Sequence, residues 1–196
     1  MTSFTPKTKA MAATVTSLVA LTGAAFAHSA NAREVSQNSS ALEAQVVRLG
    51  QVPNFWAVNC PIELGSATAW AQGDDVEAGA LRGDGFMLGV REQLRSDTGE
   101  TGASIGLEFH SAAEAKADLN RRELAAGHAG YATNFAVLES PSVRAYTVRT
   151  PDSTTVRVGF TRGNDEYALT VTAAPGADVD ALQQTLATAA GRALSR

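Results

Sequence analysis

The chain has 196 residues with a formal net charge of −4, and 44% of its residues are hydrophobic. This modest acidic charge argues against nucleic acids and anionic membranes as partners, because both would repel the protein. The single cysteine, Cys60, excludes an internal disulfide, so packing must supply the stability of the fold. We expect Cys60 to be a small buried residue, with an intermolecular disulfide or a reactive thiol as the alternative.

Residues 1–32 have the features of a secretory signal peptide. Two lysines, Lys7 and Lys9, precede a run of mostly small, apolar residues over 11–27. Two A-x-A cleavage sequences lie at or just after the end of this run, Ala25-Phe26-Ala27 and Ala30-Asn31-Ala32. The alternative, a retained membrane anchor, needs about 20 strongly apolar residues, and this run falls short of that requirement. We therefore predict cleavage after Ala32, a secreted or extracytoplasmic product and no stable membrane insertion afterwards.

Cleavage at this position leaves 164 residues with a charge of about −6, enough for one domain with a substantial core. Alanine and glycine are abundant and Lys116 is the single lysine of this part, a composition associated with bacteria of GC-rich genomes. We predict an N-terminal helix and an irregular aromatic segment over 33–84, and an α+β sandwich domain over 85–196. The two parts are expected to form one folding unit.

The first part of the mature chain contains one clear periodic signal. Residues 41–49 predict a short helix that places Leu42, Val46 and Leu49 on one face. Residues 50–83 have no such period, and we expect an irregular segment packed by its aromatics or partly exposed. Three large aromatics lie in it among prolines and glycines: Phe55, Trp56 and Trp70. Three acids, Asp74, Asp75 and Glu77, are interpreted as a loop.

Strand signals dominate the chain from residue 85 onward. Two alternating runs, 86–94 and 103–109, flank the turn residues 97–102 and predict an antiparallel hairpin. Four further strands are expected, the last two joined by a turn at 162–165: 132–138, 143–150, 155–161 and 166–173.

Two helices accompany these strands. Ser111 and Glu114 fit a capping box, and the helix that they begin is expected to end at Ala126, before Gly127. Its buried side is expected to hold small and branched apolar residues: Ala112, Ala115, Leu119 and Leu124. The final helix is expected over 179–194, with Asp178 as its N-terminal cap. Leu182 and Leu186 are expected to face inward.

The predicted order is β-β-α-β-β-β-β-α, which indicates the α+β class. We expect a two-layer sandwich in which helices cover a mainly antiparallel sheet of about six strands. This order resembles photosystem II PsbP-type and nuclear-import Mog1-type sandwiches in topology, without a shared motif. Such a scaffold hosts many functions, so function must be argued from sites.

Ser104 lies within a G-x-S-x-G sequence, Gly102 to Gly106, the pattern of the α/β-hydrolase nucleophile elbow. Asp118 and His128 follow in the chain order of a hydrolase triad. The elbow requires a strand, then a turn, then a helix, whereas here the turn precedes the serine and a strand follows it. We therefore interpret Ser104 as a strand residue on the solvent face, with a small extracellular hydrolase as the alternative.

Two further short motifs have ordinary turn chemistry. Asp97-Thr98-Gly99 matches the D-T-G of aspartic proteases, but its catalytic partner would have to come from a homodimer. Arg82-Gly83-Asp84 matches the tripeptide of integrin ligands, which would need an exposed loop tip. We interpret both sequences as turns.

The histidines and acids do not have the spacing of metal ligands. His110 and His128 are eighteen residues apart and no ligand pair lies between them. The acids near Asp74 lack the EF-hand pattern, and no phosphate-binding glycine loop follows a strand. We expect no metal and no cofactor.

The aromatic side chains Phe55, Trp56 and Trp70 are the candidate ligand-binding residues. Large aromatics with a polar edge suit surfaces that are half apolar and half wet, although they also fill the ends of cores. We expect an exported, soluble bacterial protein that binds a partner protein, a cell-envelope component or a small apolar ligand without catalysis. A structural envelope protein is the further alternative.

Overall fold

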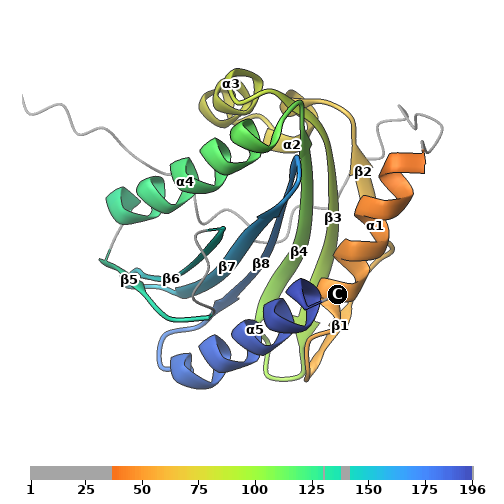
Figure 1. The fold of residues 1–196 in the computed structure, drawn as a ribbon. Helices are drawn as coiled ribbons and strands as arrows, with labels where there is room; N and C mark the ends of the chain where they lie inside the picture. Colours follow the sequence, from red (N-terminus) through yellow and green to blue (C-terminus); the bar gives the residue numbers. More distant parts are fainter. Residues whose placement is uncertain (1–36, 130, 138–141, 196) are drawn as a thin grey trace, which may run out of the picture.

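The computed structural model describes residues 37–129, 131–137 and 142–195 (Figure 1), so the predicted signal peptide lies outside the described residues. Five helices are present in these ranges: α1 (Gln37–Gly50), α2 (Ala67–Ala71), α3 (Asp75–Gly83), α4 (Ala112–Ala129) and α5 (Val179–Leu194). The strands are β1 (Phe55–Ala57), β2 (Ile62–Leu64), β3 (Phe86–Ser96), β4 (Thr101–Phe109), β5 (Tyr131–Asn134), β6 (Val143–Arg149), β7 (Thr154–Arg162) and β8 (Asp165–Ala173).

All the strands pair antiparallel in one eight-stranded sheet. Its order is β1-β3-β4-β8-β7-β6-β5, and β2 pairs with β3 beside β1. The α+β class and the antiparallel sheet covered by helices are thereby confirmed. The sheet has more strands than the six expected because β1 and β2 are three residues long, too short to show alternation in the sequence.

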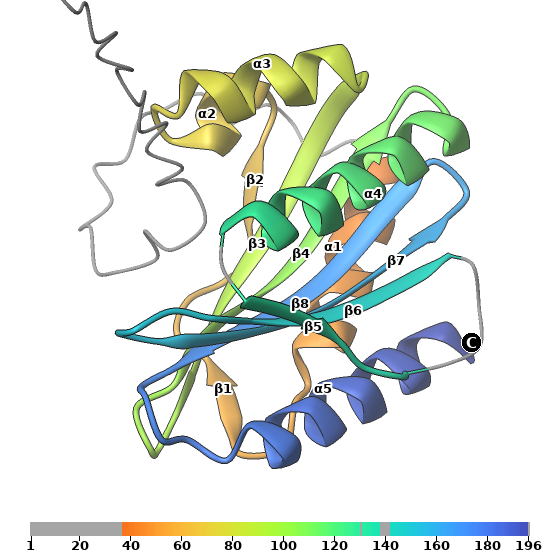
Figure 2. The same ribbon diagram turned by 90° about the vertical axis from the view of Figure 1, so that its left-hand side faces the viewer.

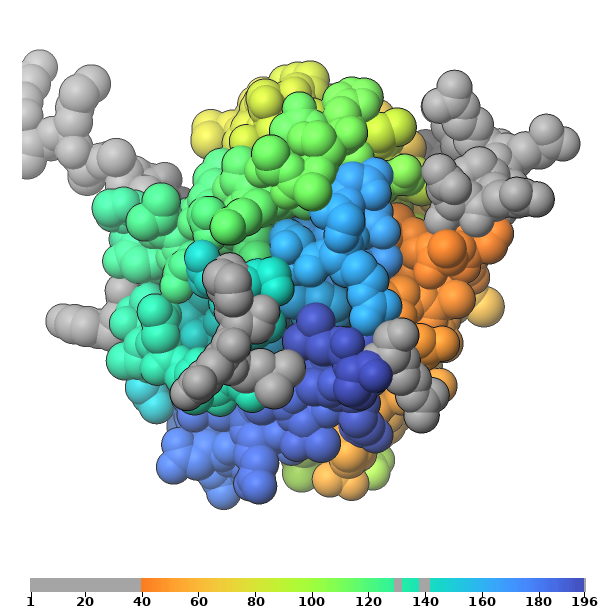
Figure 3. Space-filling view, viewed as in Figure 1, coloured from red at the N-terminus to blue at the C-terminus, as the bar shows by residue number. Residues whose placement is uncertain are grey.

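Helices cover both faces of a strongly bent sheet (Figures 1 and 2). We call the side under α1 and α5 face A, which contains Val156 and Val158 of β7. Face B lies under α4, with α2 and α3 at one end, and contains Arg157 and Gly159 of β7. In the space-filling view, the light-blue β7–β8 end separates the green α4 from the dark-blue α5 (Figure 3).

Face A carries an apolar core built from alternate strand residues and the inner sides of two helices. The prediction that Leu42, Val46 and Leu49 face inward is confirmed, since all three are buried. α1 can approach β4 closely because Gly106 has no side chain: a Cβ there would lie 2.9 Å from Leu42 Cδ1 and from Val46 Cγ2. The final helix, its Asp178 cap and the burial of Leu186 are confirmed.

Face B is packed by different means, with glycines beneath large side chains. Leu119 of α4 lies over Gly159, where a Cβ would be 2.8 Å from Leu119 Cδ1. The indole of Trp70 covers Gly89 in the same way. Phe86 continues this cluster, with its ring centroid 6.3 Å from the Trp70 ring and 6.3 Å from the Phe109 ring.

The expectation of an irregular segment over 50–83 was wrong, because two short strands and two short helices form there. The acids interpreted as a loop are the start of α3. The Asp74 side chain accepts hydrogen bonds from the Val76 and Glu77 amides, each at 3.0 Å. Such a cap satisfies amides that have no partner within the helix, and the helix dipole favours the nearby acids.

The boundaries and buried side of α4 also differ from expectation. The helix continues through Gly127 to Ala129, because a glycine ends a helix only where the chain adopts a left-handed turn. Ala112 is exposed and Leu124 is 67% exposed, whereas Ala115, Asp118 and Leu119 form the buried side. The capping interaction is present: the Glu114 amide donates to Ser111 Oγ at 3.3 Å.

The hairpin strands β3 and β4 and the β7–β8 hairpin are confirmed. β5 ends at Asn134, earlier than the expected 138, which itself lies outside the described residues.

Replacing Gly89 by alanine is expected to lower the free energy of unfolding by about 1–3 kcal/mol. The new Cβ would lie 2.4 Å from Trp70 Cε3, so the indole or the strand must move. Urea denaturation measures the effect. The control is Gly79→Ala in α3, where a Cβ meets nothing within 4 Å, and which is expected to be neutral or stabilising by about 0.5–1 kcal/mol. Equal stabilities of the Gly89→Ala variant and the wild type would contradict the packing described here.

Candidate functional site

The structure does not bring the three predicted aromatic residues together. Trp56 pairs with Arg95 of β3, and Trp70 covers Gly89 of the same strand. Six residues of strand separate these positions, or about 20 Å. Trp70 is buried in the face B core, Phe55 packs partly buried against the face A core, and Trp56 is exposed.

The region around Trp56 is an exposed apolar sheet edge. We define Phe55–Leu64, which comprises β1, β2 and the residues between them, as the edge segment. Trp56, Val58 and Ile62 are exposed by 45%, 55% and 36%. Cys60, which lies between β1 and β2, is also exposed, so the expectation of a buried cysteine was wrong. The reason is that β1 and β2 pair only with β3, and no further described strand covers their outer side.

Ser104 does not have the environment of a nucleophile. It lies inside β4 on face A, completely buried, and its Oγ donates to the carbonyl oxygen of Val46 at 2.7 Å. The solvent-facing position expected for it was wrong because α1 covers that face. Asp118 lies on face B, and His128 follows it on α4 at about 15 Å. The sheet therefore separates the serine from the other two residues of the supposed triad.

The other short motifs lie at the ends of regular elements. Asp97 is exposed at the turn between β3 and β4, where Gly99 adopts a φ of 94°, so the turn interpretation is confirmed. Arg82 and Gly83 close α3, and the Asp84 carboxylate accepts a hydrogen bond from Arg121 Nε at 2.7 Å. Arg82-Gly83-Asp84 is thus part of a helix end rather than a loop tip.

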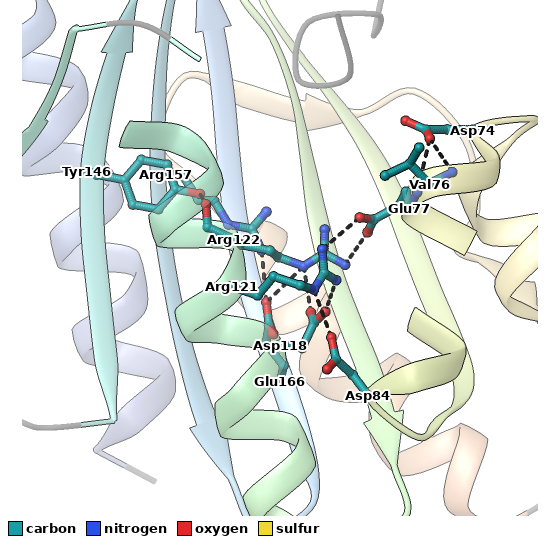
Figure 4. A network of polar contacts seen from close by, with 10 residues as sticks. All are labelled: Asp74, Val76, Glu77, Asp84, Asp118, Arg121, Arg122, Tyr146, Arg157 and Glu166. Atoms are coloured by element: carbon teal, nitrogen blue, oxygen red, sulfur yellow. Dashed lines mark hydrogen bonds and ion pairs between the residues drawn. The ribbon is translucent and has the colours of Figure 1, made fainter. Parts of the chain in front are cut away.

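A cluster of buried charges lies between α3, α4 and face B (Figure 4). We define the charge cluster by its seven residues: Glu77, Asp84, Asp118, Arg121, Arg122, Arg157 and Glu166. Arg122 is its centre. Its Nε lies 2.6 Å from Asp118 Oδ2 and 3.8 Å from Glu166 Oε1, and its Nη2 lies 2.7 Å from Glu77 Oε1.

Helical spacing assembles one half of the cluster. Arg121 and Arg122 follow Asp118 by three and four residues, so all three share one side of α4. Asp118 forms an ion pair with each of the two arginines. Arg121 extends to α3, with its Nη1 2.9 Å from Glu77 Oε2.

The sheet supplies the other half. Arg157 Nη2 donates to Glu166 Oε1 at 2.9 Å, and its Nη1 donates to Thr170 Oγ1 at 3.2 Å. The register places Gly159 and Ala168 between the two charged residues, and these small residues leave room for the arginine along the sheet.

The two central carboxyl groups have opposite pKa shifts. Burial raises the pKa of Glu166 to about 8, and the negative charge of Asp118 adds to this effect. Burial alone would raise the pKa of Asp118 too, but Arg122 and a hydrogen bond from Glu166 lower it to about 2. Glu166 is therefore the protonated partner and Asp118 the ionised one.

Both carboxyl groups are 0% exposed, so neither can meet a substrate in this conformation. The cluster instead connects α3 and α4 to the sheet. The cluster could not be predicted from the sequence, because Glu166 lies in a strand far along the chain from α4. The one available signal was the i, i+3, i+4 spacing of Asp118, Arg121 and Arg122 on the helix side that carries Leu119.

A surface hollow of about 510 Å³ lies at the connection between β8 and α5. Its lining includes Arg149, Thr154 and Asp178, and the Asp178 carboxylate caps α5. Its polar lining does not favour a small apolar ligand.

No described helix is long and apolar enough to cross a membrane, and no group of three His, Cys, Asp or Glu in these ranges could hold a metal ion. No protein-family model matches the chain, and no curated protein does. Among solved structures, it is similar to the extracellular domain of PknH from Mycobacterium tuberculosis. The identity is 12% and the TM-score 0.49, over 84% of this chain and 99% of that one; this similarity indicates nothing about function.

Replacing Asp118 by asparagine is expected to lower the free energy of unfolding by about 3–5 kcal/mol, because Arg122 loses its nearest buried counter-charge. Urea denaturation at neutral pH measures the effect. The control is Glu123→Gln, which removes an ion pair to Arg144 at 2.8 Å with both side chains about a quarter exposed and should change stability by less than about 1 kcal/mol. Similar small effects of both variants would contradict the role of the cluster.

Stability is expected to fall as pH rises from about 5 to about 8. The folded pKa of Glu166, about 8, lies above its ordinary value of 4.5, so folding favours the protonated form. That contribution is complete below the ordinary pKa and is lost as pH rises through the folded one. Thermal unfolding across this range should show a smaller loss for Glu166→Gln, whose amide resembles the protonated acid. Parallel curves for the variant and the wild type would show that Glu166 titrates normally.

Proposed function

We propose that this chain is an exported, non-catalytic bacterial binding protein that recognises an extended, apolar segment of a partner protein through its edge segment. One observation carries the proposal: Trp56, Val58 and Ile62 expose large apolar side chains along one sheet edge. Contiguous apolar surface of this kind is typical of interaction sites.

The backbone of the edge supports an extended partner. β1 and β2 each pair with β3 on one side, which leaves their outer amides and carbonyls without a strand partner among the described residues. An extended peptide can add to such an edge, where main-chain hydrogen bonds give affinity and side chains give specificity.

The charge beside the edge favours an acidic residue in that partner. Trp56 lies opposite the exposed Arg95 in the register of β1 and β3. A partner residue that packs on the indole would therefore have a guanidinium next to it. We infer a segment that combines apolar residues with at least one carboxylate.

Export is part of the proposal and depends on the signal-peptide features of residues 1–32. The catalytic alternative has no such support: Ser104 is buried under α1, and Asp97 lies in an exposed turn. A broad ester and peptide substrate screen, repeated with Ser104→Ala and Asp97→Asn, would detect hydrolysis if it occurs.

The test begins with expression of the full chain in a bacterial host. The secreted product should have the mass of a chain that begins at Arg33. Proteins retained by it from envelope extracts of the source bacterium are then purified, and their affinity is measured by calorimetry. Trp56→Ala and Ile62→Ser should each weaken binding by about 2 kcal/mol, or about thirtyfold, as truncation of a central interface residue does.

The matched control is Leu124→Ser, which removes an exposed apolar side chain, 67% exposed, from α4, away from the edge. It should leave affinity unchanged. Equal affinities of the edge variants and the wild type, or no retained protein that binds again after purification, would contradict the proposal. Self-association that Trp56→Ala abolishes would identify the structural alternative instead.

A further inference from the structure

Arg91 is a partly buried arginine of face B that differs from the arginines of the charge cluster. It lies on β3, opposite Ile105 of β4 and Ile62 of β2. Its guanidinium carbon lies 4.4 Å from the centroid of the Trp70 ring, a cation–π contact that fixes the planar group. Its Nε is buried and has no hydrogen-bond partner.

Arg121 and Arg122, the neighbouring arginines of the charge cluster, have carboxylate partners, whereas Arg91 has none within the described residues. Arg121 and Arg122 bind Glu77 and Asp118, and Arg157 binds Glu166. Over the described ranges, no ion pair or hydrogen bond engages the guanidinium of Arg91. Burial lowers the pKa of Arg91, and the nearby charge of Arg122 lowers it further. An anion bound to Arg91 would offset both of these unfavourable effects.

The charge around Arg91 is not balanced. Counting Arg91, this end of face B holds four guanidinium groups and four carboxyl groups, one of which is the protonated Glu166. With Glu166 protonated, the positive charges in this group of eight residues outnumber the negative ones by one. Arg91 is only partly buried, so an ion can approach it from solvent.

We propose that Arg91, held against the indole of Trp70, is an oxyanion-binding site for a carboxylate or phosphate group. A guanidinium offers a fork of N–H donors that matches two oxygens of either group. The Trp70 ring covers one flat face of the Arg91 guanidinium, so an anion would meet the N–H groups along the edge of that group. The site depends on the core packing of Trp70 and is independent of the partner proposed for the edge segment.

Trp70 itself provides the measurement. The chain has two tryptophans, so Trp56→Phe leaves Trp70 as the single indole fluorophore, in contact with Arg91. Sodium phosphate and sodium succinate are titrated separately into this variant at constant ionic strength, with sodium chloride as the reference. We expect a saturable change in Trp70 emission with at least one of the two anions, and the effective one distinguishes phosphate from carboxylate ligands.

Arg91→Gln in the same background should remove the response, and Arg91→Lys, which keeps the charge without the fork, should weaken affinity at least about tenfold. The control is Arg95→Gln, four residues along the same strand and face, which should respond normally. Chloride producing the same change, no saturation with either anion, or an unchanged response in the folded Arg91→Lys variant would overturn the proposal. If Arg91→Gln does not fold, the lysine variant decides the result.

Discussion

The compensation of buried charge beneath α4 is the constraint on which face B depends. Asp118 is fully buried, and the energy lost in removing a carboxylate from water amounts to several kcal/mol unless a counter-charge and hydrogen bonds replace the water. Arg122 provides this charge and pairs in turn with Glu77 from α3, while the protonated Glu166 from β8 forms a hydrogen bond with Asp118. Three elements that are distant in sequence must therefore be in place together. We infer that the cluster selects one position for α4 on the sheet, rather than adding much net stability.

The two faces of the sheet solve the packing problem differently, and this places the sites. Face A is mainly apolar and is covered by α1 and α5, and the buried hydroxyl of Ser104 is used within the fold. Face B combines glycines under large side chains with the charge cluster, and within the described residues it leaves Arg91 without a counter-ion. The exposed edge and the unpaired guanidinium are both next to β3. In its register, Ile62 lies opposite Arg91 and Trp56 opposite Arg95.

Much of the fold could be predicted from local patterns. The periodicity of residues 41–49, the alternation in β3 and β4, and the caps at Ser111 and Asp178 each depend on residues close together in the chain. The segment 50–83 could not be predicted, because strands of three residues and a helix of five are shorter than the windows in which a period is visible. Of the predicted ligand-binding residues, Trp56 is exposed while Trp70 belongs to the core, and their role in binding stays a prediction.

The sequence by itself determined the α+β class, the order of most elements and the signal-peptide pattern, since hydrophobic period, capping chemistry and composition are local properties. Only the tertiary structure decided which face each helix covers, and with it the burial of Ser104 and the separation of Trp56 from Trp70. It also decided that Asp118 and Glu166 meet, while Arg91 has no carboxylate partner in the part of the chain that the structure describes. The physical reason is that a charge is paired or unpaired according to its neighbours in space, and those come from strands and helices far apart in the chain.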